Sequence, residues 1–248
     1  MKKILIVDDE RMMQMLAKRI LLPHYDVIVA SSGEEAIKLY AREMPDMVLS
    51  DLLMPNMSGY ELLEELKRIH GRDIPIMFMT ADDSEESESK GFETGAMDYI
   101  RKPFKADVLL RRVENIMRQN ARMESLEKEA KTDRMTGLLN KAATHEEIGK
   151  AAKREEGILL MIDLDAFKLV NDIYGHEVGD EVLIAFSDII RKSVRAEDII
   201  GRLGGDEFVA FCHGSFDDDV IAGKSHFLNE EIIKASKEIM GEDMTIPI

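Results

Sequence analysis

The sequence predicts an α/β protein with two domains joined by a helix, on three observations. The chain has 248 residues, enough for two ordinary domains, and its 45% hydrophobic content is enough for a core in each. Short apolar runs alternate with amphipathic stretches from residue 3 to about 118, and a second alternation starts after Thr132. Between them, residues 106–132 contain neither Gly nor Pro. We therefore expect a domain over 1–120, a helical linker over 106–132 that continues its last helix, and a domain over 133–248.

The apolar runs of the first domain are continuous, which is typical of parallel strands buried on both faces. They are Ile4–Val7, Val27–Ala30, Met47–Leu49, Ile76–Met79 and Met97–Ile100. Because right-handed crossovers place helices on both faces, the pattern predicts a five-stranded, parallel, doubly wound sheet. Ligands of such a sheet bind beyond the carboxyl ends of its strands. The acidic run from Asp82 to Glu88 is interpreted as a solvated loop and helix start.

Residues 106–132 are predicted to form one long helix. Positions that step by four and three form a heptad seam: Leu109, Val113, Ile116, Asn120, Met123, Glu127 and Ala130. An Asn within such a seam is typical of paired helices, where it fixes the register. The alternative is an amphipathic helix packed on its own domain, because a pairing seam persists over several repeats.

The second domain shows a different order of elements. The pattern predicts helices over 144–155, 178–194 and 220–240, a strand over Ile158–Ile162, and two short strands around Gly204 and Gly205, the second over Phe208–Phe211. Thr245–Ile248 resembles the start of a further strand, at which the chain stops. We therefore expect this domain to be incomplete at its C-terminus, with an exposed sheet edge.

Composition excludes several classes of function. The 33 Lys and Arg residues against 49 Asp and Glu residues give a net charge of -16, which argues against nucleic acid as a partner. The single cysteine, Cys212, cannot form an internal disulfide. No apolar run approaches the ~18 residues of a membrane span, and the N-terminus lacks a signal-peptide cleavage site. A cytoplasmic protein without membrane insertion is predicted.

Polar residues follow four of the predicted parallel strands. They are Asp8 and Asp9, Asp51, Thr80, and Lys102 before Pro103. A lone Asp at such a place is usually a helix cap and a lone Lys is usually solvated, but the combination is much rarer. Clustered carboxylates repel one another unless a cation lies among them, and oxygen ligands favour Mg²⁺. Asp51 could then attack phosphorus, with Lys102 and Thr80 contacting the phosphoryl oxygens.

The first domain resembles the receiver domain of bacterial response regulators, which has a flavodoxin-like fold. The resemblance rests on Ile6-Val7-Asp8-Asp9, Leu49-Ser50-Asp51-Leu52-Leu53-Met54-Pro55-Asn56-Met57-Ser58-Gly59 and Lys102-Pro103-Phe104. It implies Asp51 as phosphoacceptor, Mg²⁺ held by Asp9, Asp51 and the Leu53 carbonyl with Asp8 acting through water, and Thr80 and Tyr99 as a switch pair. It also implies a sensor histidine kinase as partner and a homodimer on phosphorylation.

A second group of acids lies around a glycine turn. Asp163 ends a predicted strand, and Asp206 and Glu207 follow two adjacent glycines, which permit positive φ and close approach of a phosphate. If the two strands are neighbours, the three acids could hold one or two Mg²⁺ ions. The alternative for Gly-Gly-Asp is an ordinary hairpin turn. A calcium loop is excluded, because Phe167 and Lys168 stand where an oxygen ligand and a glycine are required.

The second domain resembles the GGDEF domain of diguanylate cyclases, an α/β fold like a nucleotide-cyclase palm. The matching motifs are Asp133-Arg134-Met135-Thr136-Gly137-Leu138-Leu139-Asn140, Asp163-Leu164-Asp165-Ala166-Phe167-Lys168, Asn171-Asp172, Gly175-His176, Gly179-Asp180 and Gly204 to Phe208. Departures are Lys141, where the family has Arg, and Ala166, where it often has a bulkier residue. The resemblance implies GTP as substrate, cyclic di-GMP as product, and an active site formed between two such domains.

The resemblance also implies roles for individual residues. Mg²⁺ ligands are Asp163, Glu207 and the Leu164 carbonyl, while Asp206 aids deprotonation of the attacking 3′-hydroxyl. The guanine and phosphate contacts are Asn171 and Asp180 for guanine, Gly204 and Gly205 for the α-phosphate, and Phe167 and Lys168 for the outer phosphates. Arg195 and Asp198 match the inhibitory motif that binds product, although an Arg and Asp at this spacing can also be a surface ion pair.

The hypothesis from the sequence is a phosphorylation-regulated diguanylate cyclase that forms the output of a two-component system. One alternative is a catalytically impaired sensor that binds cyclic di-GMP through Arg195 and Asp198 and acts through protein contacts. Another is a plain receiver whose second domain binds no nucleotide.

Overall fold

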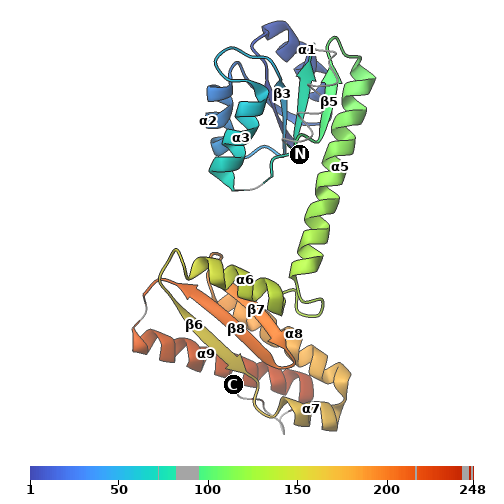
Figure 1. Ribbon diagram of the computed structural model, residues 1–248. Coiled ribbons are helices and arrows are strands. Elements are labelled where there is room, and N and C mark those ends of the chain that lie inside the picture. Colours follow the sequence, from blue (N-terminus) through green and yellow to red (C-terminus); the bar gives the residue numbers. More distant parts are fainter. Residues whose placement is uncertain (72, 82–94, 216, 242–245, 247) are drawn as a thin grey trace. The chain divides into compact units, whose positions relative to one another are not determined.

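The computed structural model in Figure 1 describes residues 1–71, 73–81, 95–215, 217–241, 246 and 248. The chain divides into two compact units, Met1–Glu124 and Ser125–Ile248. Each unit is described by itself. No helix among these residues is long and apolar enough to cross a membrane. Asp82 to Glu88 lie outside the described residues.

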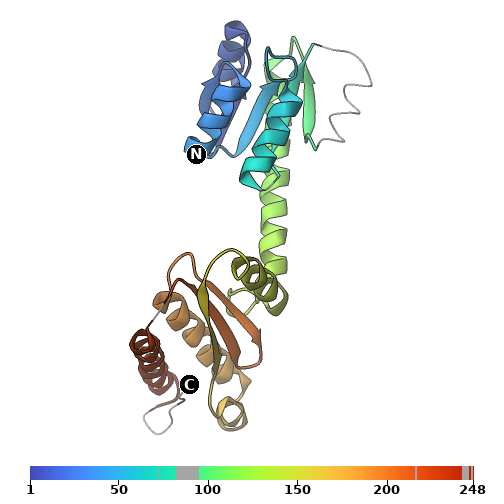
Figure 2. The ribbon, with the colours of Figure 1, turned by 60° about the vertical axis from the view of Figure 1, so that its left-hand side comes forward.

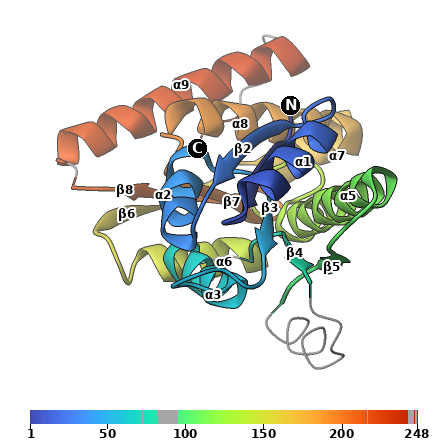
Figure 3. The ribbon, with the colours of Figure 1, turned by 90° about the horizontal axis from the view of Figure 1, so that it is seen from above.

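The first unit contains a parallel sheet with strand order β2-β1-β3-β4-β5, which confirms the predicted doubly wound fold. Its strands are β1 (Lys3–Val7), β2 (Asp26–Ala30), β3 (Met47–Asp51), β4 (Ile76–Thr80) and β5 (Asp98–Arg101). Its described helices are α1 (Arg11–Leu21), α2 (Gly33–Glu43), α3 (Gly59–His70) and α5 (Ala106–Lys131). Figure 3 shows α2 and α3 on one face of this sheet and α1 and α5 on the other. Each face buries its own apolar cluster.

The start of α3 lies directly against the end of β3. Ser58 caps the helix by accepting from the Glu61 N–H, and the Glu61 side chain accepts from the Ser58 N–H in return, which is a capping box. A Cβ at Gly59 would lie 2.6 Å from the carbonyl oxygen of Asp51. Only glycine therefore allows this close approach, which fixes the chain around the end of β3.

Helix α5 is one continuous helix, as predicted, but its seam has two different environments. Leu109, Val113 and Ile116 are at most 2% exposed and belong to the core of their own unit. For these positions the paired-helix interpretation is wrong and the alternative holds, because their side chains are already buried. Further along, Met123 is 56% exposed, and the neighbouring Leu126 is 54% exposed.

The second unit contains a three-stranded antiparallel sheet with order β6-β8-β7. The strands are β6 (Gly157–Asp163), β7 (Ile199–Gly204) and β8 (Glu207–His213), and the helices are α6 (Lys141–Ala151), α7 (Phe167–Tyr174), α8 (His176–Ser193) and α9 (Asp218–Met240). In Figure 2, α6 lies on one face of this sheet and α8 and α9 lie on the other. The core is formed mainly by residues of α7, α8 and α9 together with Phe208 of β8.

Two predictions for this unit need correction. Helix α6 begins at Lys141 rather than 144, because the Asn140 side chain accepts from the Ala143 N–H and caps it there. Helix α7 was not predicted. Of the expected strand Thr245–Ile248, residues 245 and 247 lie outside the described residues, whereas Ile246 and Ile248 donate their N–H groups to Ser236 and Asn229 of α9.

Candidate functional site

Three carboxylates gather at the carboxyl edge of the parallel sheet. Asp8 and Asp9 follow β1 and Asp51 ends β3, and one oxygen from each lies within 4.8 Å of the others. Asp8 is fully buried, Asp51 is 7% exposed and Asp9 is exposed. Parallel pairing of β1 with β3 brings these ends together, as the sequence predicts.

Lys102 joins this group from the segment after β5. Its Nζ lies 2.8 Å from Oδ2 of Asp8 and 2.8 Å from Oδ2 of Asp51. The remaining oxygens accept backbone N–H groups, Asp8 Oδ1 from Glu10 at 2.8 Å and Asp51 Oδ1 from Leu53 at 3.4 Å. The peptide bond from Lys102 to Pro103 is cis. The ammonium therefore provides the positive charge that two buried carboxylates require.

Electrostatics at this site favour cations. Burial disfavours the charged form of Lys102, but the carboxylates of Asp51 and Asp8 outweigh burial and raise the pKa of its ammonium above the ordinary value. Burial raises the pKa of Asp8. The donor set consists of oxygens only, with one carboxylate facing solvent, and such a set fits a hard divalent ion such as Mg²⁺.

Thr80 and Tyr99 lie on the adjacent strands β4 and β5. Thr80 ends β4 and is 4% exposed, and Tyr99 on β5 is 6% exposed. The Tyr99 ring packs 5.6 Å from the Phe78 ring, measured between centroids. The tyrosine side chain is therefore already packed inward in this structure.

The second group of acids forms at the end of the antiparallel sheet. Asp163 of β6 stands directly opposite Glu207 of β8 in the strand register. The turn before Glu207 has φ of 144° at Gly204 and 54° at Gly205, which favours glycine at both places. Among the described residues, however, only Asp8, Asp9 and Asp51 bring three ligand oxygens within 4.8 Å of one another. The group with Asp206 is thus more open.

Arg202, which the sequence reasoning missed, supports this turn. Its Nε and Nη2 donate to the carbonyl oxygen of Gly205 at 2.9 and 2.7 Å. The side chain is 10% exposed, although arginine is rarely buried without a partner. Its position shortly before the two glycines is the signal that could have revealed it.

The predicted guanine-contacting residues come from α7 and α8, which pack together. A Cβ at Gly179 would lie 2.0 Å from Oδ1 of Asn171, so the Asn171 side chain lies over the residue that precedes Asp180. Phe167 is buried at the start of α7, and Lys168 beside it is exposed. Leu164, after β6, is 1% exposed. The structure therefore brings Asn171 close to the Asp180 segment.

Residues 195–198 form a tight turn, named here the Arg195 turn. The Asp198 N–H donates to the Arg195 carbonyl at 3.1 Å, and Oδ2 of Asp198 accepts the Arg195 N–H at 2.8 Å. The Asp198 side chain is 2% exposed, whereas Arg195 is exposed. Asp198 therefore holds the turn together, and no ion pair between the two side chains is recorded among the described residues.

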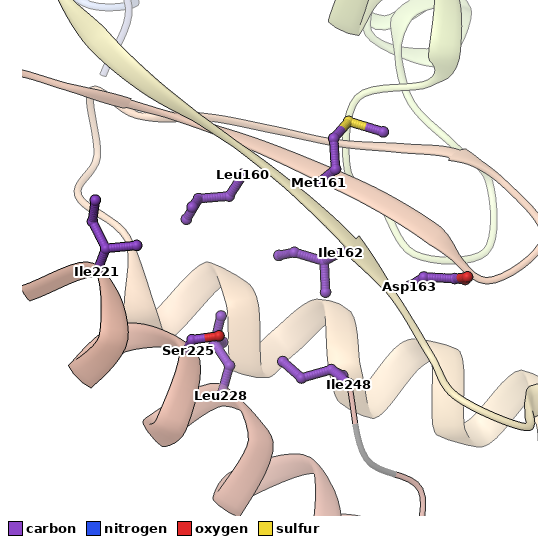
Figure 4. Close-up of a pocket in the computed structure, with 8 residues that line it drawn as sticks. All are labelled: Leu160, Met161, Ile162, Asp163, Ile221, Ser225, Leu228 and Ile248. Atoms are coloured by element: carbon purple, nitrogen blue, oxygen red, sulfur yellow. The ribbon is translucent and has the colours of Figure 1, made fainter. Parts of the chain in front are cut away.

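A small apolar pocket of about 130 Å³ lies between β6 and α9. Figure 4 shows its lining: Leu160, Met161, Ile162, Asp163, Ile221, Ser225, Leu228 and Ile248. Asp163 stands at one end of the lining, on the side of the glycine turn. Asp163, which stands opposite Glu207, is the one acidic side chain among these lining residues.

Comparisons with known proteins match both units of the chain. A family model for the response regulator receiver domain matches residues 4–114, and a model for the diguanylate cyclase GGDEF domain matches residues 130–240. Response regulator PleD of Caulobacter vibrioides is 31% identical over 221 residues, which cover 84% of this chain and 48% of PleD. The alkaline phosphatase synthesis regulator PhoP of Bacillus subtilis is 38% identical over 139 residues, covering 56% of this chain and 57% of PhoP.

Solved structures match the first unit. The chemotaxis protein CheY4 of Vibrio cholerae is 29% identical with a TM-score of 0.45, covering 47% of this chain and 98% of that structure. The chain spans about half the length of the curated relatives it matches. The two family matches occur in the order of the two acidic sites. The chain is therefore a response regulator in which a receiver domain is followed by a GGDEF domain.

Proposed function

We propose that the protein is a phosphorylation-regulated diguanylate cyclase, which converts two GTP molecules into cyclic di-GMP and two pyrophosphates as the output of a two-component system. The observation that carries the proposal is the pairing of two sites in one chain. One is the contact of Lys102 with Asp51, and the other is Asp163 opposite Glu207 beside the glycine turn.

In the receiver domain, an oxygen of Asp51 attacks the phosphorus of a phosphohistidine on a sensor histidine kinase. The phosphorus–nitrogen bond breaks, a phosphorus–oxygen bond forms, and the imidazole leaves. Lys102 already contacts Asp51, so its ammonium needs only a small shift to pair with the incoming phosphoryl oxygens. Asp9, Asp51 and the Leu53 carbonyl, with Asp8 acting through water, would hold Mg²⁺, which would neutralise charge on the acids and on the phosphoryl group.

In the GGDEF domain, each copy binds one GTP and two copies form the active site as a homodimer. Asn171 and Asp180 together offer an acceptor and a donor pattern that matches the guanine edge. Gly204 and Gly205 carry no side chain that would keep the α-phosphate away from the backbone. The 3′-oxygen of one GTP attacks the α-phosphorus of the other, pyrophosphate leaves, and Asp206 assists removal of the hydroxyl proton. Asp163, Glu207 and the Leu164 carbonyl would hold Mg²⁺ there.

A second candidate is a non-catalytic sensor of cyclic di-GMP. It is favoured by the more open arrangement of Asp163, Asp206 and Glu207, together with an exposed Arg195 on a well-formed turn. In that case the Arg195 turn binds cyclic di-GMP and the protein acts through contacts with other proteins.

The test is product formation by the longest native form of the protein. It is incubated with GTP and Mg²⁺, with and without acetyl phosphate, as wild type, Asp51→Asn, Glu207→Gln and the exposed control Glu146→Gln. We expect more cyclic di-GMP with the phosphoryl donor, no stimulation in Asp51→Asn, no product from Glu207→Gln and wild-type behaviour from the control. Absence of product in every condition contradicts the proposal, and retained cyclic di-GMP binding then favours the sensor.

A further inference from the structure

The side chain of Gln14 joins the ends of two neighbouring strands. Gln14 lies near the start of α1, and its Nε2 donates to the carbonyl oxygen of Asp8 at 2.6 Å and to that of Ala30 at 3.2 Å. Asp8 follows β1, and Ala30 ends β2. An amide nitrogen carries two hydrogens, so both donors of Gln14 are used in this link.

The same link fixes the backbone on one side of Asp9. The peptide group between Asp8 and Asp9 is held through its carbonyl oxygen by the Gln14 amide. The next peptide group is held through the Glu10 N–H, which donates to Oδ1 of Asp8 at 2.8 Å. One side chain therefore holds the peptide group before Asp9, and another holds the peptide group after it.

These backbone contacts matter most for Asp9 because its own side chain has little support. The Asp9 carboxylate is exposed, and no hydrogen bond or ion pair of it is recorded in the part of the chain that the structure describes. Asp8 and Asp51, in contrast, are buried and both contact Lys102. Asp9 is therefore the one of the three clustered acids whose place depends most on the backbone that carries it.

We propose that Gln14 is a positioning residue for magnesium binding: by holding the Asp8 carbonyl, its amide keeps Asp9 beside Asp51 before the ion binds. This inference rests on the proposed function, which takes Asp9 and Asp51 as magnesium ligands. Groups that orient metal ligands raise affinity, because ligands already in place lose less entropy when the metal binds. Removal of the Gln14 amide therefore weakens magnesium binding although every ligand is retained.

The test variant is Gln14→Met, which keeps the side-chain length and the helix propensity but removes both donors. Calorimetric titration of Mg²⁺ into the metal-free full chain is expected to give a dissociation constant about threefold to tenfold above wild type, the size of one net hydrogen bond. During phosphorylation by acetyl phosphate, the Mg²⁺ concentration for half-maximal rate should rise by the same factor, while the rate at saturating Mg²⁺ stays at the wild-type value. The matched control Gln119→Met makes the same exchange at an exposed position of α5 and should change neither quantity.

A purely structural link between β1 and β2 gives a different result. Chemical denaturation in EDTA would then show a less stable Gln14→Met protein whose dissociation constant for Mg²⁺ equals that of the wild type, and this outcome overturns the inference. Asp51→Asn separates it from a failure of the proposed function, because this variant lacks a magnesium ligand. If Asp51→Asn binds Mg²⁺ as tightly as the wild type, the proposed magnesium site fails, and the role of Gln14 fails with it. If Asp51→Asn loses binding and Gln14→Met does not, only the role of Gln14 is overturned.

Discussion

Arg202 and Asp133 are joined by a hydrogen bond of 3.2 Å between Nη1 and Oδ1, although they are 69 positions apart in the sequence. The same guanidinium donates to the Gly205 carbonyl. Asp133 also accepts from the N–H and hydroxyl of Thr136. One arginine therefore links the segment that follows α5 to the glycine turn of the candidate cyclase site.

We expect Arg202→Ala to lower both stability and cyclic di-GMP formation. Removing a nearly buried guanidinium leaves the Gly205 carbonyl without this donor and takes one of three donors from Asp133, which costs about 1–3 kcal/mol. Chemical denaturation gives the unfolding free energy, and product formation is measured in parallel. Lys150→Ala is the control, because Lys150 makes only exposed ion pairs with Glu146 and Glu147. Equal effects of the two substitutions would show that the arginine link is unimportant.

Lys102→Met should make the stability of the receiver domain depend on Mg²⁺. The substitution leaves Asp8 and Asp51 buried without a cation, and breaking a buried pair in this way costs about 3–5 kcal/mol. Denaturation in EDTA should show this loss, and Mg²⁺ should restore part of it by binding the same carboxylates. The exposed pair of Arg111 with Asp107 provides the control substitution, Arg111→Met. A loss that Mg²⁺ leaves unchanged argues against metal binding at these acids.

The receiver site was predictable because topology alone decides it. Asp8 and Lys102 follow strands of one parallel sheet and Asp51 ends a third strand, and the carboxyl ends of such strands share an edge whatever the detailed packing. The second group of acids was less accessible to this reasoning. Whether Asp163 faces Glu207 depends on the antiparallel register of β6 and β8, which the spacing of residues does not determine.

Other features depend on tertiary contacts that no local pattern encodes. Helix α7 has only 8 residues, which is too short for a helical period of apolar residues to stand out in the sequence. It begins after Ala166, whose φ is 58°. The motif containing Asp198 predicts a ligand contact. In the structure, the Asp198 carboxylate accepts hydrogen bonds from the backbone N–H groups of Arg195 and His213, which belong to two separate segments. Pairing partners of this kind are set by the folded chain.

Asp198→Asn should reveal a pH-dependent contribution to the stability of the second unit. Hydrogen bonding holds the folded pKa of Asp198 below its ordinary value, so its stabilising effect is present above the unfolded pKa of about 3.9 and is lost as pH falls through the lower folded value. We expect the variant to be less stable by about 1–3 kcal/mol near neutral pH, with the difference shrinking below about pH 4. Taking the difference in unfolding free energy between the two proteins at each pH removes the contributions that the other carboxylates make to both. A difference that grows on acidification contradicts the assignment.

Substitutions at the two ends of α5 should have different effects: those near Leu109 should lower stability, and those near Met123 should weaken association of two copies. Leu109 is fully buried, so Leu109→Ala should cost about 2–5 kcal/mol of unfolding free energy. Met123→Glu combined with Leu126→Glu changes exposed side chains and should alter the unfolding free energy by no more than about 0.5 kcal/mol.

The same double variant tests association. If the exposed part of α5 around Met123 and Leu126 pairs two copies in the proposed homodimer, the variant should be monomeric after phosphorylation, because buried glutamates without partners oppose association. Light scattering after acetyl phosphate treatment measures the mass, and a dimer that survives the double substitution places the interface on other residues.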